Sequence, residues 1–305
     1  MDSKLVHAAV AAYQEEADPA ETSRLAFFEG LLDIQQERAD FVAAQNGWHA
    51  PEAAQIVALY RAPEGVFSQV PVALDAADFA QTCQQIASYM ADHAGLDDAA
   101  TRALQAFDWN AFCARVDLVR AGTDPASFIE ETLAHIDSFD VSADLPANVL
   151  MMVPAFALRA HLQPAAEAAV AAYQDADDHH SFERSVDCPV CGSPATASWV
   201  GESAASDGRG RMQYCAMCGT QWNFDRIRCG NCGTRSTSHL HYFNVAGDPA
   251  HRLQRCDDCG GYQRVVFRED MKVQPFAMEV EDVVMARLDE IAHDPRFQNA
   301  PTYDV

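Results

Sequence analysis

The sequence predicts a mixed α+β protein of several domains, with a helical N-terminal part and a strand-rich C-terminal part. Three observations support this division. Residues 1–180 are rich in Ala, and their apolar residues recur at helical spacing. The later residues hold short alternating runs that are typical of strands. Eight of the ten cysteines lie in this later part, grouped in four Cys-x-x-Cys pairs.

Several segments of the N-terminal part have the pattern of amphipathic helices. The clearest is 23–45, where apolar residues recur three or four positions apart with acids between them. Similar segments lie at 76–92, 98–115 and 125–137. A last helical stretch, 146–174, contains Pro154 and Pro164, which we expect to break or kink it. Residues expected to begin helices are Asp18-Pro19, Thr22 and Asp124-Pro125.

The polar stretch 175–187 has no periodicity and is interpreted as a linker. Short strands are predicted beyond it, at 196–201, 211–215, 239–245 and 262–267. An amphipathic helix is predicted over 280–294. The expected domains are an acidic all-α domain (1–180), a first four-cysteine module (185–226), and a second four-cysteine module with the C-terminal helix (227–305).

The four cysteine pairs form a tandem repeat. Each cysteine of the first two pairs has a counterpart 41 positions later, and the surrounding letters repeat as well: "CPVCGS" resembles "CGNCGT", and "RMQYCAMCG" resembles "RLQRCDDCG". Each unit reads C-x2-C-x23-C-x2-C, a spacing typical of four-cysteine metal sites. The predicted metal ligands are Cys188, Cys191, Cys215, Cys218, Cys229, Cys232, Cys256 and Cys259.

We therefore predict two tandem rubredoxin-like or zinc-ribbon modules, with one tetrathiolate ion, zinc or iron, in each. A glycine follows every pair, as expected where a turn needs a left-handed backbone. Pairing in sequence order is favoured, and a cross-braced pairing of the first with the third pair is the alternative. A second alternative is that the pairs are redox dithiols or disulfides. Four thiolates leave no open position on the ion, which argues against hydrolytic catalysis.

Charge limits the classes of partner. The formal net charge is −24, with 9 Lys+Arg against 29 Asp+Glu in residues 1–184 and 12 against 16 in residues 185–305. Such a chain repels phosphate, so binding to nucleic acid or to anionic membranes is not expected. No signal-peptide pattern opens the sequence, and the most apolar stretch, 149–158, is too short for a bilayer crossing. We expect a soluble, cytoplasmic protein without membrane insertion.

No catalytic motif stands out, so the protein is not expected to be an enzyme. The two cysteines outside the repeat, Cys83 and Cys113, are expected to be small buried hydrophobic residues. His239 and His241 follow strand spacing beside the fourth pair, where four thiolates already suffice for a metal. Asp257-Asp258, inside that pair, is interpreted as an exposed acidic turn, with contact to a partner as the alternative.

Four segments together resemble the formate dehydrogenase accessory protein FdhE family: "DCPVCGSPATASWV", "GRMQYCAMCGTQWNFDRIRCGNCG", "LQRCDDCGGYQRVVF" and "EVEDVVMARLDEIA". The resemblance covers the order and spacing of all four cysteine pairs, Trp222, the "CDDCG" turn and the amphipathic closing helix. It implies a cytoplasmic accessory protein, not itself an enzyme, that is required for active respiratory formate dehydrogenase. It also implies that the eight paired cysteines bind iron or zinc in rubredoxin-type turns.

By this resemblance, the expected partner is the catalytic, molybdenum-cofactor-bearing subunit of formate dehydrogenase, bound in the cytoplasm before its export. The predicted function is that of a maturation chaperone, and a homo-oligomer is compatible with it. Two alternatives come from other classes of protein. One is a rubredoxin-like electron carrier or redox protein; the other, disfavoured by the acidic charge, is a zinc-ribbon nucleic-acid binder.

Overall fold

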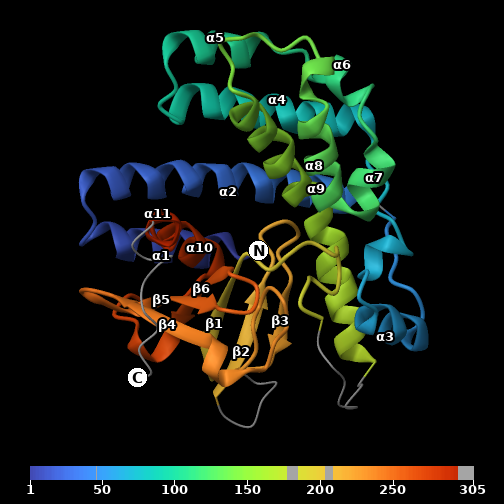
Figure 1. The fold of residues 1–305 in the computed structure, drawn as a ribbon. Helices are drawn as coiled ribbons and strands as arrows, with labels where there is room; N and C mark the ends of the chain where they lie inside the picture. The colour runs from blue at the N-terminus through green and yellow to red at the C-terminus, as the bar shows by residue number, and fades with distance from the viewer. Residues whose placement is uncertain (46, 177–184, 203–208, 295–305) are drawn as a thin grey trace.

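The computed structural model describes residues 1–45, 47–176, 185–202 and 209–294. Figure 1 shows a helical part stacked on a single sheet, with helix α9 running from the helices down beside the strands. The predicted α+β class is therefore confirmed, with helices in the N-terminal part and a sheet that carries two four-cysteine clusters. Most of the predicted linker, residues 177–184, lies outside the described residues.

The helical part contains nine described α-helices: α1 (Ser3–Gln14), α2 (Pro19–Gln45), α3 (Ala53–Arg61), α4 (Ala76–His93), α5 (Asp98–Ala106), α6 (Trp109–Cys113), α7 (Leu118–Thr123), α8 (Pro125–Ala134) and α9 (Ala147–Asp175). A 3-10 turn, η1 (Val66–Ser68), follows α3, and another, η2 (Ile136–Ser138), follows α8. The segments predicted at 23–45, 76–92 and 125–137 correspond to α2, α4 and α8. The segment predicted at 98–115 is divided into α5 and α6, because Asp108 caps a new helix by accepting from the Ala111 N–H.

Aspartates start the helices where the sequence predicts. Asp18 accepts hydrogen bonds from the N–H groups of Ala20 and Glu21, both at 2.9 Å, and so caps α2. Asp124 caps α8 in the same way. Thr22 is wrong as a helix start, since the Asp18 cap begins the helix one turn earlier.

Helix α9 is not broken at Pro154 or Pro164, so that part of the prediction is wrong. Each proline removes one hydrogen bond within the helix. About half of the helix is buried against α2, α4 and α3. The resulting burial of apolar surface outweighs the local cost of the two prolines.

The six strands of the described residues form one sheet in the order β3-β2-β1-β6-β5-β4. They are β1 (Ala197–Glu202), β2 (Arg209–Tyr214), β3 (Gln221–Phe224), β4 (Leu240–Val245), β5 (Asp248–Cys256) and β6 (Tyr262–Phe267). The 41-residue repeat is visible in them, because β4, β5 and β6 follow β1, β2 and β3 at about that distance. The four predicted strands correspond to β1, β2, β4 and β6, and β3 and β5 are additions that the alternation does not reveal.

Parallel pairing of β1 with β6 joins the two antiparallel units into this single sheet, with Ala197 opposite Arg264 and Val200 opposite Phe267. The predicted boundary at 226/227 lies between β3 and β4, and the sheet is continuous across it. The domain limits themselves stay predictions.

The closing helix predicted over 280–294 is in fact two short helices, α10 (Met278–Val284) and α11 (Arg287–His293). The division has a packing reason. Val280, Val283 and Val284 pack against α1 and α2, whereas Met285, Leu288 and Ala292 pack against the sheet. Met278, at the start of α10, also contacts the sheet cluster, so the chain turns between the two helices while both stay in contact with the sheet.

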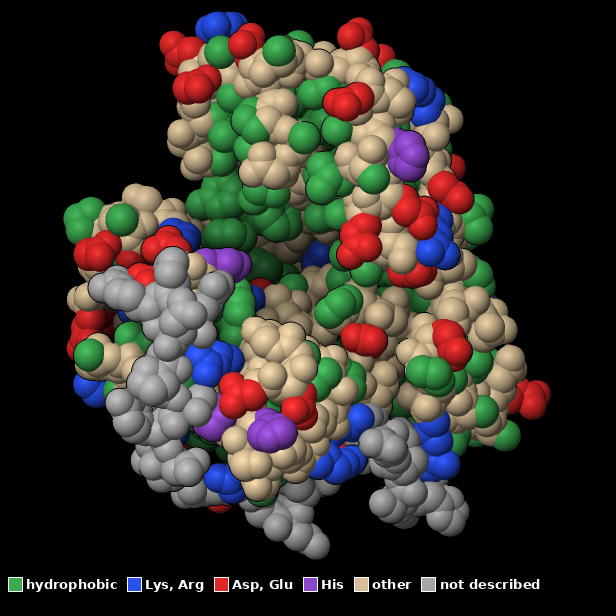
Figure 2. Space-filling model, in the orientation of Figure 1, with side chains coloured by type: hydrophobic (Ala, Val, Ile, Leu, Met, Phe, Trp, Pro, Cys, Tyr) green, Lys and Arg blue, Asp and Glu red, His purple; other side chains and the backbone are tan. Residues whose placement is uncertain are grey.

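Arginines of the strands are partly turned inward. Arg211 is only 1% exposed and donates to Ser198 Oγ, the Arg228 carbonyl and Gln263 Oε1. Arg264 is 8% exposed and pairs with Asp282 at 2.6 Å. On the face drawn in Figure 2, Asp and Glu side chains are spread among Lys and Arg, and no continuous basic surface is seen there. None of the described helices has both the length and the apolar character needed to cross a bilayer.

Candidate metal centres

The eight paired cysteines gather into two groups of four, each with all its sulfurs within 4.8 Å of one another. The groups follow sequence order, as favoured above, and the cross-braced alternative is wrong. The first cluster consists of Cys188, Cys191, Cys215 and Cys218, and the second cluster of Cys229, Cys232, Cys256 and Cys259. All eight are free thiols.

The sulfur separations suit a tetrahedral ion. In the first cluster Cys188 and Cys218 are 3.6 Å apart, as are Cys191 and Cys215. In the second cluster the separations are 3.9 Å for Cys229–Cys259 and 3.7 Å for Cys232–Cys256. An ion with bonds of about 2.3 Å to four tetrahedral sulfurs needs them roughly 3.8 Å apart. Both clusters therefore have the geometry and the soft donor atoms to hold one zinc or iron ion each.

Each pair sits on the same kind of turn. In the first, the Cys188 N–H donates to the Ser193 carbonyl at 2.8 Å, and the Gly192 N–H donates to the Cys188 carbonyl at 2.9 Å. The same two bonds recur at the other three pairs. The glycine after each pair has a positive φ, from +70° to +84°, which explains why glycine is used there.

The first cluster is enclosed by the helical part. Its four cysteines are at most 1% exposed and belong to the hydrophobic core shared with α2, α4 and α9. The N–H groups of Val66 and Phe67, in η1, donate to the carbonyls of Pro189 and Val190 at 3.0 and 2.8 Å. The first cysteine turn is therefore hydrogen-bonded directly to a segment more than 120 residues earlier in the chain.

A buried cation holds the other turn of the first cluster. The Arg159 guanidinium, from α9, donates to the Ala216 carbonyl between Cys215 and Cys218 at 3.1 Å. It also donates to Tyr214 Oη and pairs with Glu279 Oε1, both at 3.1 Å. Arg159 thus connects α9, the cysteine turn and α10. It also places a positive charge beside a centre that would carry net negative charge when four thiolates bind a divalent ion.

The second cluster lies near the surface. Cys229 and Cys256 are buried, whereas Cys232 and Cys259 are exposed. The N–H groups of Asn231 and Cys232 point at Cys229 Sγ, at 3.4 and 3.5 Å. These contacts stabilise negative charge on that sulfur.

The histidines beside the second cluster contact aspartates. His239 Nδ1 lies 2.6 Å from Asp258, and His241 Nε2 lies 2.9 Å from Asp257. Neither imidazole belongs to the four-thiol group. Asp257-Asp258 is exposed, as its interpretation as an acidic turn predicts. Cys83 and Cys113 are buried in the helical core, also as predicted.

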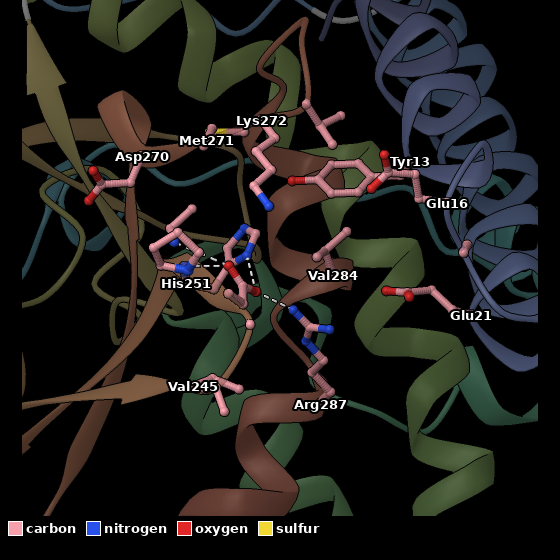
Figure 3. A pocket seen from close by; sticks show the side chains of 17 residues that line it. Tyr13, Glu16, Glu21, Val245, His251, Asp270, Met271, Lys272, Val284 and Arg287 are labelled. Atoms are coloured by element: carbon pink, nitrogen blue, oxygen red, sulfur yellow. Dashed lines mark hydrogen bonds and ion pairs between the residues drawn. The ribbon is translucent and has the colours of Figure 1, made fainter.

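A polar cavity of about 310 Å³ opens where α1, β5, α10 and α11 meet (Figure 3). Tyr13, His251 and Arg287 point toward it. His251 bridges Asp248 (2.7 Å) and the fully buried Glu281 (2.8 Å), and Glu281 also accepts from the Tyr13 hydroxyl. None of these residues stands out in the sequence, because they come from segments up to 268 positions apart.

The hydrogen bonds and charges of this network shift the pKa values of His251 and Asp248. Burial alone would lower the pKa of His251, but its hydrogen bonds to Asp248 and Glu281 outweigh burial and raise the pKa to about 9. Burial would raise the pKa of Asp248. The hydrogen bond from His251 and the positive charges of His251 and Arg287 outweigh burial and lower that pKa to about 2. At neutral pH His251 is therefore an imidazolium, held between Asp248 and Glu281.

These shifts predict how stability depends on pH. Because the pKa of His251 is higher in the folded than in the unfolded chain, its contribution is complete below about pH 6.5 and is lost as the pH rises through about 9. The loss is on the order of 3 kcal/mol. Urea unfolding at a series of pH values should show this decrease for the native chain. His251→Gln should be less stable at pH 6 and should lack the decrease; an equal decrease in that variant would assign it to another group.

Comparison with known proteins finds relatives of the segment that carries the cysteine pairs. A family model described as "FdhE, central domain" matches residues 187–226. The protein FdhE homolog of Cronobacter sakazakii is 35% identical over 106 residues, 34% of this chain and 33% of that protein. Protein FdhE of Escherichia coli O9:H4 (strain HS) is 33% identical over 106 residues, with the same shares. The matched segment thus spans about a third of the length of these curated relatives.

The fold agrees over a longer stretch. The crystal structure of the FdhE protein from Pseudomonas aeruginosa matches with a TM-score of 0.53 at 18% identity, and the match covers 96% of this chain and 92% of that one. At this identity the match shows the fold. By the sequence around its cysteine pairs and by the fold of nearly the whole chain, the predicted resemblance to the FdhE family is confirmed.

Proposed function

We propose that this protein is an accessory factor in the maturation of formate dehydrogenase. In this proposal it is not an enzyme, and it binds the catalytic subunit of formate dehydrogenase in the cytoplasm, before that subunit is exported. The observation that carries the proposal is the pair of four-thiol clusters on a sheet whose sequence and fold match FdhE proteins. The identity of the partner comes from the family, which is that of formate dehydrogenase accessory proteins.

The eight cysteines are proposed to hold two tetrathiolate ions, zinc or iron. When bound, each ion cross-links two cysteine turns that lie 24 to 30 residues apart. It supplies stability that a unit of about 40 residues cannot obtain from its own apolar core. No open position is left on an ion with four thiolates, which supports a binding role rather than catalysis.

The proposal predicts a specific complex. A tagged full-length chain, expressed in a cell that makes a respiratory formate dehydrogenase, should retain the catalytic subunit with its export signal still attached. An exported subunit of an unrelated enzyme serves as the control and should not be retained. If affinity purification and mass spectrometry detected no formate dehydrogenase subunit at all, the proposal would be wrong.

A second candidate function is electron transfer by rubredoxin-like iron. The observation that favours it is the exposure of Cys232 and Cys259, since a redox centre must be within reach of its partner. Zinc has no redox chemistry, so the identity of the bound metal tests this second candidate function. A coloured iron protein that is reversibly reduced would support this candidate, and a colourless zinc protein that still binds the catalytic subunit would exclude it.

A further inference from the structure

The two clusters have the same sulfur geometry but different surroundings. We propose that they have separate roles: the first cluster is a closed structural centre, and the second is the site at which the protein exchanges a thiophilic divalent ion with its surroundings. The proposal rests on metal binding by the eight cysteines and does not depend on the identity of the partner.

The sequence of the repeat already differs at the residues enclosed by each pair. In the first unit these are apolar: Pro189, Val190, Ala216 and Met217. At the positions 41 residues later they are Gly230, Asn231, Asp257 and Asp258. The apolar set packs on the helical core, where Val190 is fully buried and Met217 lies against the same cluster of side chains. Asn231, Asp257 and Asp258 are exposed instead.

The space around the cysteine turns is also more restricted in the first cluster than at one turn of the second. A methyl group added at Gly192 would lie 3.0 Å from the Glu64 carbonyl, and one at Gly219 would lie 2.7 Å from the Arg159 guanidinium carbon. Both turns of the first cluster are thus covered by residues of the helical part. At Gly260, the counterpart of Gly219, no atom of the described chain lies within 4 Å of such a group.

Exchange of a four-coordinate ion needs an entering ligand to reach it while a resident sulfur leaves. In the second cluster the exposed sulfurs of Cys232 and Cys259 can leave one after the other, each taking up a proton, as donor atoms of the entering ligand replace them. No electron is transferred in this step. Asp257 and Asp258 add negative charge at the same edge and favour the approach of a cation. Among the described residues, η1 and Arg159 cover the turns of the first cluster; a cavity reaches it beside Cys218, but all four of its cysteines are at most 1% exposed.

Release kinetics test the proposal. The full-length chain, loaded with two equivalents of Zn²⁺, is mixed with excess 4-(2-pyridylazo)resorcinol, which changes its absorbance on binding Zn²⁺. Two phases of one ion each are expected, with rates that differ at least tenfold. Cys232→Ser and Cys259→Ser should remove the fast phase and keep the slow one. Release of both ions in one phase, or a fast phase that persists in both variants, would overturn the proposal.

Mapping on the native chain gives an assignment that needs no variant. After one equivalent of Zn²⁺ has been withdrawn, the chain is alkylated with iodoacetamide and digested. Label is expected on Cys229, Cys232, Cys256 and Cys259, and label on the first cluster instead would contradict the proposal. No formate dehydrogenase is present in either experiment, so their outcome is independent of the pull-down described above.

Discussion

Replacing Cys191 with Ser is expected to cause the largest loss of stability of any single change at the metal centres. The variant loses one of four ligands in a site that is buried and shared with the helical core. It also leaves a hydroxyl in surroundings built for a metal-bound sulfur. We expect a loss of about 5 kcal/mol, since removal of a structural metal is among the most destabilising of changes. In a melting experiment this corresponds to a decrease of roughly 10 °C or more.

The tandem repeat provides a matched control. Cys232 occupies the equivalent position in the second unit, but its side chain is exposed and its turn makes no contact with η1 among the interactions described. Cys232→Ser should lower the metal content from two ions to one and leave the melting temperature of the helical part largely unchanged. Thermal melting followed by circular dichroism, together with metal analysis, compares Cys191→Ser with Cys232→Ser. Equal destabilisation by the two substitutions would show that the centres contribute alike.

Replacing Arg159 with Met is expected to have the next largest effect. Arg159 and Glu279 are 5% and 14% exposed, so removal of the cation leaves a nearly buried carboxylate without its partner. The Ala216 carbonyl and Tyr214 hydroxyl lose a donor at the same time. Breaking a buried pair in this way costs about 3–5 kcal/mol. Urea unfolding should show that loss, and release of the ion from the first cluster should become faster.

Arg120 is a suitable control for Arg159, because it pairs with Asp124 at 3.2 Å at the surface, where both side chains are 39% exposed. Arg120→Met should cost under about 1 kcal/mol, as exposed ion pairs usually do. Arg159→Lys should recover only part of the loss, since an ammonium group does not reproduce the planar fork that reaches four acceptors, Gln163 Oε1 among them. Full recovery with Lys would mean that charge alone, without this geometry, accounts for the role of Arg159.

The features that depend on a few consecutive residues, such as the cysteine turns and two helix caps, could be predicted from the sequence. The 41-residue period indicates two equivalent units, and the order of the cysteine pairs indicates how they combine. This works because each turn is formed by four or five consecutive residues with a glycine at the end, and because the repeat assigns the second and third pairs to different units although only ten residues separate them. Asp18 and Asp124 begin helices for the same local reason. The closing helix shows the limit, since its periodicity does not reveal that its two halves face different surfaces.

The sequence by itself determined the longer helices of the N-terminal part apart from α1, four of the six described strands and the two groups of four cysteines. Only the tertiary structure decided that β1 pairs with β6, that Arg159 and η1 enclose the first cluster, and that the second cluster stays open on one side. The first two of these features depend on hydrogen bonds and ion pairs between residues 55 to 123 positions apart. No periodicity or spacing encodes such pairs, because they are selected by the packing of whole elements against one another. The two units therefore share one local pattern, and the helical part that covers only one of them makes them different.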